Sequence, residues 1–176
     1  MEGLSLAGAE SVSNALRRRR RAVPAPTLFC VPRVPRYVLP DGVFHVTARG
    51  VGNEPICRDD DDRLLFVDLL HATGVRFDWE LHAWCLMTNH YHLLVGSTRE
   101  KLSLGLHRLN GLYAQRFNRR HCRKGHLFGD RFWASVVEDE HFQAARTYIL
   151  LNPVRAKRCD VPEQYCWSGT PYGKEV

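Results

Sequence analysis

The chain has 176 residues, of which 44% are hydrophobic, as is typical of one globular domain with a substantial core. No apolar stretch approaches the length that crosses a membrane, and the N-terminus lacks the apolar core of a signal peptide. The six cysteines are scattered without a Cys-X-X-Cys pair, which argues against a disulfide framework and a cysteine zinc site. We therefore expect a reduced, cytoplasmic protein that contacts no membrane.

The net charge of +6 is unevenly distributed along the chain. Residues 1–36 hold seven arginines against two glutamates, a balance of +5, which leaves only +1 for residues 37–176. Within that second part, residues 99–131 hold nine basic residues against two acidic ones, a balance of +7. A solvated helix face explains these charges about as well as a polyanionic partner does, but interleaved aromatic rings favour nucleic acid, whose bases stack on them. The aromatic residues are Tyr113, Phe117, Phe128 and Phe132.

The chain divides into a tail and a folded part. Residues 1–36 are arginine-rich and punctuated by four prolines, which predicts a disordered basic tail. Residues 37–176 then form a single domain, whose first strand is predicted over residues 43–48 because two glycines follow this β-compatible run.

The spacing of apolar residues predicts the elements that follow. Asp59 to Asp62 precede apolar residues at helical spacing, which indicates a helix that ends near Phe77 and carries acidic residues in its first turn. We prefer this explanation of the four aspartates to a metal site. The later elements are a strand over 79–86, a strand from 90, a helix over 100–122, a strand over 132–137, and a helix over 138–151 that Pro153 ends or bends.

The order of these elements, β-α-β-β-α-β-α, predicts the fold class. It is typical of an α+β, ferredoxin-like sandwich, in which helices cover one face of an antiparallel sheet. The short segment 87–89 joins the second and third strands, so these two are expected to form an antiparallel hairpin.

Two histidines one residue apart, His90 and His92, are the first candidates for chemistry. Side chains alternate along a strand, so both imidazoles are expected on the same side of the sheet, with Tyr91 on the other. Two such imidazoles can hold one divalent cation, which needs a third ligand and an open position to act on a substrate. For the tripeptide alone, a half-exposed strand with two unrelated histidines is the commoner explanation.

A tyrosine near such a cation could attack a phosphodiester, because its phenolate forms a covalent phosphotyrosine bond. Tyr91 is a poor candidate, since it points away from the histidines. Tyr148 has Asn152 one helical turn later on the same face, where the amide oxygen could act as the third ligand. On spacing, Tyr148 is the stronger candidate than Tyr113, although a buried structural tyrosine is the commoner outcome for either.

Four segments carry motifs in a characteristic order: 81–94 (LHAWCLMTNHYHLL), 113–120 (YAQRFNRR), 125–128 (GHLF) with Arg131 and Phe132, and 148–156 (YILLNPVRA). Together they resemble the REP-associated tyrosine transposases, members of the single-tyrosine HUH transposases that act on single-stranded DNA. The resemblance extends over about residues 37–167.

The resemblance implies a ferredoxin-like nuclease domain that cleaves and rejoins single-stranded DNA at hairpin repeats through a covalent 5′-phosphotyrosine. By position, it makes His90 and His92 ligands of Mg²⁺ or Mn²⁺, Tyr148 the nucleophile, and Asn152 the third ligand. Thr88 departs from the family, which usually has proline there, and this should alter the rigidity of the turn more than the chemistry.

The resemblance also implies the partners of the chain. These are single-stranded or hairpin DNA, bound in the bacterial cytoplasm at the nucleoid by a monomer or a homodimer. We expect four arginines to hold the DNA backbone. They are Arg116, Arg119, Arg120 and Arg131.

Three alternatives remain. A histidine-triad nucleotide hydrolase alternates three histidines along a strand, but Leu94 stands in the third place. A domesticated or inactive protein that only binds repeat hairpins would not need to keep His90, His92, Tyr148 and Asn152 together. A defective copy of a transposable element, with normal site residues, is the third.

Overall fold

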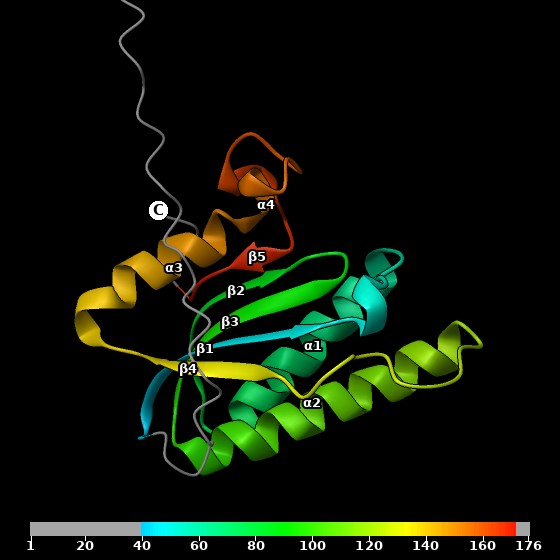
Figure 1. The fold of residues 1–176 in the computed structure, drawn as a ribbon, viewed down its shortest axis with the longest axis horizontal. Helices are drawn as coiled ribbons and strands as arrows, with labels where there is room; N and C mark the ends of the chain where they lie inside the picture. Colours follow the sequence, from blue (N-terminus) through cyan, green and yellow to red (C-terminus); the bar gives the residue numbers. More distant parts are fainter. Residues whose placement is uncertain (1–39, 172–176) are drawn as a thin grey trace, which may run out of the picture. The chain divides into compact units, whose positions relative to one another are not determined.

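The structure is a computed structural model and describes residues 40–171. The predicted basic tail, residues 1–36, and the predicted start of the domain at residue 37 lie outside the described residues. Five strands form one antiparallel sheet in the order β4-β1-β3-β2-β5 (Figure 1). The strands are β1 (Gly42–Arg49), β2 (Glu80–Leu86), β3 (His90–Ser97), β4 (Trp133–Val137) and β5 (Ser168–Gly169).

Helices connect these strands in the predicted order, which confirms the α+β, ferredoxin-like fold. The predicted helix over 138–151 begins instead as a 3₁₀ turn and becomes α-helical only at Phe142. Pro153 bends the chain rather than ending the helix outright, because a short helix restarts around it, where its missing N–H costs nothing. The α-helices are α1 (Asp60–Arg76), α2 (Arg99–Arg120), α3 (Phe142–Leu150) and α4 (Asn152–Arg155), and the 3₁₀ turns are η2 (Val51–Asn53), η3 (Asp139–His141) and η4 (Pro162–Gln164).

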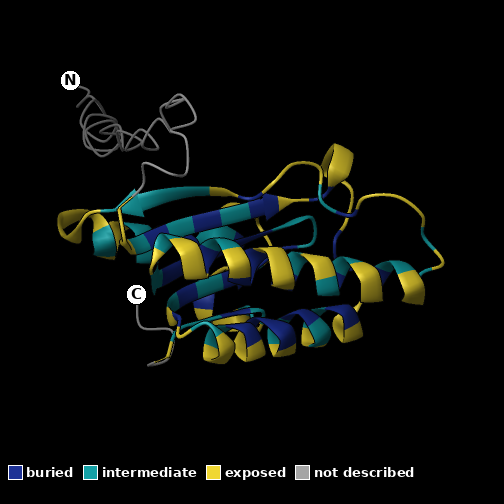
Figure 2. Cartoon of the chain, turned by 90° about the horizontal axis from the view of Figure 1, so that it is seen from below, coloured by how far each residue is buried: buried dark blue, intermediate teal, exposed yellow. Residues whose placement is uncertain are grey.

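The two faces of the sheet carry different helices (Figure 1). The expected packing on one face holds for α1 and α2, which cover the side chains of Phe44, Val46, Tyr91 and Leu93 in the main core. In contrast, α3 packs on the opposite face, because strand alternation leaves a smaller apolar cluster there. Figure 2 shows the central strands as buried and the outward sides of the long helices as exposed. The smaller cluster consists of Ala83, Cys85, Met87, Leu94 and Ile149.

The four aspartates begin α1, as the sequence predicts. Asp59 caps the helix, since its side chain accepts a hydrogen bond from the backbone N–H of Asp62. Asp62 is fully buried and also accepts from the backbone N–H of Arg58 at 2.8 Å. Arg120 and His121, at the end of α2, contact the same carboxylate at 2.7 and 2.9 Å. The aspartates therefore join the two helices of the main core.

The aromatic residues of the basic segment were expected to stack on bases, and for three of them the structure contradicts this. Tyr113 and Phe117 are fully buried and Phe132 is nearly so, all within the main core. For Tyr113 and Phe117 the reason is helical spacing, which turns the apolar side of α2 toward the sheet and leaves the arginines outside. Phe128 is only partly buried. In the part of the chain that the structure describes, no helix is long and apolar enough to span a membrane.

Candidate active site on the α3 face of the sheet

His90 and His92 project from the central strand β3 toward the face that α3 covers. Their ring centroids lie 5.0 Å apart, as the alternation of side chains predicts, while Tyr91 is buried in the main core on the other face. In the register with β1, Thr47 stands opposite His92 and Arg49 opposite His90. His92 is only 7% exposed, whereas His90 is half-buried.

A third histidine lies beside the pair on the same face of the sheet, and it was not predicted from the sequence. His45 lies on β1, and its Nε2 is 3.0 Å from Nδ1 of His92. The rings of His45 and His92 stack with centroids 5.2 Å apart. Side chains alternate along β1, so His45 points to the face of the sheet that α3 covers. Its position beside His92 depends on the register between β1 and β3.

Tyr148 of α3 faces this row of histidines. Its ring meets those of His92 and His45 edge-on, with centroids 5.8 and 5.9 Å apart. The guanidinium carbon of Arg155 lies 4.5 Å from the centre of the Tyr148 ring. The structure therefore brings the predicted nucleophile to the predicted histidine pair, with a positive charge against its ring.

The other described tyrosines are occupied elsewhere. The hydroxyl of Tyr91 donates to Asn110 at 2.9 Å, and the hydroxyl of Tyr113 donates to the carbonyl of Ile56 at 2.6 Å. Burial raises the pKa of both phenols, which disfavours the phenolate that attack requires. Tyr165 donates to the carbonyl of Leu86. Among the described tyrosines, Tyr148 alone has a hydroxyl with no hydrogen-bond partner and a place beside the histidines.

Asn152, the predicted third ligand, begins α4 one turn after Tyr148. Its Nδ2 donates to the backbone carbonyl of Tyr148 at 3.4 Å, which leaves Oδ1 as the atom available to a ligand. Within residues 40–171, Asn152 makes no hydrogen bond to either histidine. The structure thus places Asn152 one turn after Tyr148, with its side chain bonded to the backbone of that tyrosine.

The hydrogen bonds of the histidines suit a cation. The Asn89 amide nitrogen donates to the carbonyl of Asn53 at 3.3 Å, so its Oδ1, 2.7 Å from Nδ1 of His90, must accept a proton from that ring. This leaves the lone pair of His90 on Nε2, as in most metal-binding histidines, which donate through the other nitrogen. Burial lowers the pKa of His90 to about 4 and that of His92 to about 2, so both rings are neutral and able to bind metal at neutral pH.

Two other groups of potential metal ligands occur in the described residues. In the first, Asp59 and Asp62 with His121, the guanidinium of Arg120 already bonds both carboxylates at 2.6 and 2.7 Å. The group is therefore an ion-pair network and not a vacant metal site. The second, formed by Glu138, Glu140 and His141, is exposed and lies in the segment between β4 and α3, and exposed acidic groups are common without an ion.

Comparison with known proteins places the chain in a family. The model of the family described as "Transposase IS200 like" matches residues 44–152, well over half of the chain and the segment that holds every residue of the site except Arg155. The chain belongs to this family of IS200-like transposases. None of the curated proteins matches it.

One solved structure supports the fold of the transposase. A REP-associated tyrosine transposase, solved bound to a REP hairpin, is similar with a TM-score of 0.54 and 17% identity, covering 77% of this chain and 80% of that one. A candidate transposase from Deinococcus radiodurans R1 has a TM-score of 0.46 and 19% identity, covering 61% of this chain and 87% of the other.

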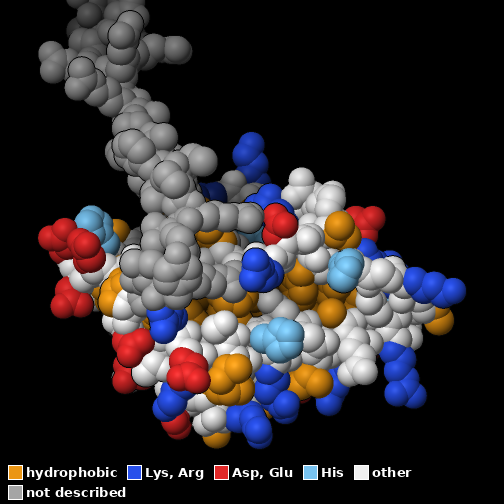
Figure 3. All heavy atoms as spheres, turned by 60° about the horizontal axis from the view of Figure 1, so that its bottom comes forward, with side chains coloured by type: hydrophobic (Ala, Val, Ile, Leu, Met, Phe, Trp, Pro, Cys, Tyr) orange, Lys and Arg blue, Asp and Glu red, His pale blue; other side chains and the backbone are white. Residues whose placement is uncertain are grey.

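The four arginines expected to bind DNA have different surroundings in the transposase. Arg116 and Arg119 are exposed on α2, and Arg131 is exposed beside it. Arg120 instead bonds Asp59, Asp61 and Asp62. Figure 3, turned toward this side of the molecule, shows Lys and Arg side chains along its lower and right edges.

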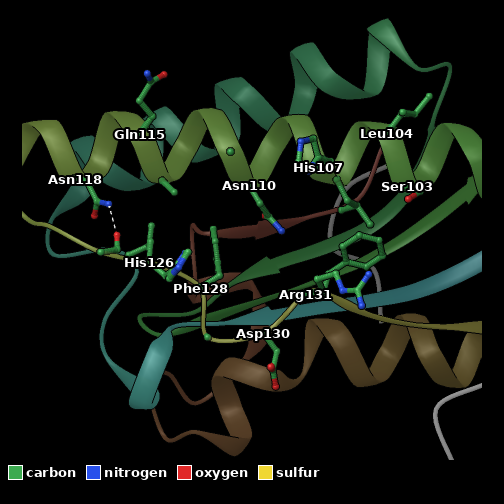
Figure 4. A pocket seen from close by; sticks show the side chains of 17 residues that line it. Ser103, Leu104, His107, Asn110, Gln115, Asn118, His126, Phe128, Asp130 and Arg131 are labelled. Carbon is green, nitrogen blue, oxygen red and sulfur yellow. Dashed lines mark hydrogen bonds between the residues drawn. The ribbon is translucent and has the colours of Figure 1, made fainter.

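A groove of about 700 Å³ lies between α2 and residues 125–132 (Figure 4). Its walls carry more apolar than polar surface, with Arg131 and Phe128 on one side and His107, Asn110 and Gln115 on the other. Because α2 and Tyr148 lie on opposite faces of the sheet, this groove is separate from the candidate active site.

Proposed function

We propose that this transposase cleaves and rejoins single-stranded DNA at hairpin repeats through a covalent bond between Tyr148 and a 5′-phosphate. The observation that carries the proposal is the edge contact of Tyr148 with His92, which brings a free phenol to a pair of neutral imidazoles. Membership of the transposase family supports DNA as the substrate, and the hairpin bound to the solved REP-associated transposase supports hairpin DNA.

The reaction is a transesterification that consumes no water. The phenol oxygen of Tyr148 loses its proton and attacks phosphorus, while the bond from phosphorus to the 3′ oxygen breaks. That oxygen takes up a proton and leaves as a 3′-hydroxyl, and Tyr148 keeps the 5′-phosphate as a diester. Attack by another 3′-hydroxyl reverses the step, which joins new ends and restores the phenol. The guanidinium of Arg155, which lies against the Tyr148 ring, stabilises the negative charge of the phenolate.

A divalent cation, Mg²⁺ or Mn²⁺, fits the donor set of the site. We propose that Nε2 of His90, Nε2 of His92 and Oδ1 of Asn152 hold it, and that the remaining positions receive the phosphate. When bound, it supplies a Lewis acid that draws charge from a non-bridging phosphate oxygen. Two imidazoles and one amide oxygen suit Mn²⁺ better than Mg²⁺, because Mg²⁺ prefers oxygen ligands throughout.

The DNA backbone is held, in this proposal, by the exposed arginines on and beside α2. Arg116, Arg119 and Arg131 present free guanidinium surface to phosphate, and Arg131 also lines the groove beside α2. For Arg120, a phosphate must compete with the carboxylates that already surround it. We therefore expect Arg120 to contribute least of the four to DNA affinity.

The test is a covalent-adduct assay. Protein and labelled single-stranded DNA with a hairpin are incubated with Mg²⁺ or Mn²⁺ and separated on a denaturing gel. We expect an adduct with the natural protein and with Tyr113→Phe, and none with Tyr148→Phe or His90→Ala. Tyr113→Phe is the matched control, because it removes a phenol oxygen that is buried away from the site. An adduct that survives Tyr148→Phe contradicts the proposal, and DNA binding without any adduct identifies a hairpin-binding protein instead.

A further inference from the structure

His45 has three aromatic neighbours and one side-chain hydrogen bond. Its Nε2 contacts Nδ1 of His92 at 3.0 Å, and the two ring planes are within 27° of parallel. Trp133 of β4 meets the His45 ring edge-on at 5.6 Å, and Tyr148 meets it at 5.9 Å. A ring fixed by three neighbours and one hydrogen bond has a defined direction, which a solvated surface histidine lacks.

The contact between the two rings constrains where His92 carries its proton. A hydrogen bond between two imidazole nitrogens needs one N–H and one lone pair. If Nε2 of His45 accepts, His92 carries its proton on Nδ1 and presents a lone pair on Nε2. If His45 donates, His92 must carry its proton on Nε2, which blocks that nitrogen as a ligand.

His45 does not join His90 and His92 as a third metal-binding histidine. Among the described residues, these three rings offer no set of nitrogens that all lie within 4.8 Å of one another, whereas two acidic groups elsewhere do. His45 instead contacts Nδ1 of His92. Asn89 contacts Nδ1 of His90 in the same way. The two histidines of the pair thus have equivalent support, one local in sequence and one from the neighbouring strand.

We propose that His45 is a positioning residue, which accepts the Nδ1 proton of His92 and so directs the Nε2 lone pair of His92 toward a divalent cation. This inference rests on the proposed metal site. Outer partners of this kind orient the ring and raise the basicity of the ligand, and their loss costs about 10–100-fold in metal affinity.

The experiment compares His45→Leu, which removes the acceptor, with His45→Gln, whose amide oxygen can still accept. Mn²⁺ affinity is measured from the electron paramagnetic resonance signal of free Mn²⁺. We expect His45→Leu to weaken binding about 10–100-fold and His45→Gln to stay within a few-fold of the natural protein. His107→Leu is the matched control, because His107 is exposed on α2 away from the sheet face of the pair, and it should change nothing.

A second measurement reports on the proton itself. In the metal-free protein, ¹⁵N shifts of the His92 ring should identify the Nδ1–H tautomer, and His45→Leu should convert it to a mixture. Thermal melting of each variant identifies any loss that comes from unfolding, and Mn²⁺ titrations are read below the melting range.

The possible results separate the two claims. If the natural protein binds no Mn²⁺, the proposed metal site fails and the inference about His45 fails with it. If the natural protein binds Mn²⁺ and His45→Leu binds it equally well, the inference alone is overturned. If His45→Gln loses as much affinity as His45→Leu, the acceptor role of His45 is wrong.

Discussion

Asn152 is the residue of the candidate site whose role depends most on what binds there. It sits at the start of α4, where its side chain donates to the carbonyl of Tyr148, and its Oδ1 is the one neutral oxygen donor we assign to the cation. Because Asn152 lies outside the strands of the sheet, we expect its side chain to be replaceable without loss of the sheet.

We predict that Asn152→Ala weakens Mn²⁺ binding at least tenfold, since outer partners of metal ligands alone are worth about 10–100-fold. Asn152→Asp, which keeps an oxygen donor and adds a negative charge, should bind Mn²⁺ at least as tightly as the natural protein. Calorimetric titration of Mn²⁺ measures both, and the melting temperature should stay within a few degrees. Equal affinity of Asn152→Ala and the natural protein would remove Asn152 from the ligand set.

Sequence reasoning succeeded for site residues whose relation is local. The alternation of a strand put His90 and His92 on one side, and the four-residue spacing put Asn152 one turn from Tyr148. It failed for His45, because its contact with His92 depends on the register between two strands, which no single segment contains. It could not anticipate the ion pairs of Arg120 either, since the carboxylates concerned lie about 60 residues earlier in the chain.

At the level of elements, the ends of α1 and α2 are joined by one buried carboxylate. Asp62 accepts from a backbone N–H, an arginine and a histidine at once, and it is fully shielded from water. The sequence predicted the helix and its acidic first turn, but it gave no sign of which aspartate would be buried. The packing of α1 against the main core sets the rotation of this helix, and the rotation decides which aspartate is buried.

We predict that Asp62→Ala lowers the free energy of unfolding by about 1–3 kcal/mol, because the backbone N–H of Arg58 and the His121 ring lose a buried acceptor, while Arg120, 36% exposed, keeps Asp59 and Asp61. Asp60→Ala is the matched control. Asp60 is 78% exposed and lies 3.8 Å from Arg63, so its loss should cost at most about 1 kcal/mol. Urea denaturation followed by circular dichroism measures both variants. A cost for Asp62→Ala no larger than that for Asp60→Ala would show that the network adds little to the packing of the two helices.

For the whole molecule, the three histidines on the α3 face of the sheet make stability depend on pH. Burial lowers the pKa of His45 and His90 to about 4 and that of His92 to about 2, whereas an unfolded histidine titrates near 6.5. Below about pH 6.5 the unfolded chain therefore binds protons that the folded protein does not. This favours unfolding, so stability is complete above pH 6.5 and falls as the pH drops toward the folded pKa values.

We predict that the urea midpoint of the metal-free protein falls between pH 7 and pH 5, with each histidine contributing up to about 1.4 kcal/mol per pH unit. His45→Leu should reduce the slope of stability against pH by the contribution of one histidine. His107→Leu, at an exposed position, should leave the slope unchanged. An identical pH profile in the natural protein and His45→Leu would contradict the assignment.

The position of β3 between β1 and β2 affects the order in which parts of the molecule unfold. Local opening costs most in a central strand and least in elements held by few buried contacts, and α3 rests only on the smaller apolar cluster. Partial unfolding therefore detaches α3, and Tyr148 with it, while His90 and His92 stay in place. Because we propose Tyr148 as the nucleophile, we expect mild heating to abolish cleavage before it separates the two histidines on β3 or unfolds α2.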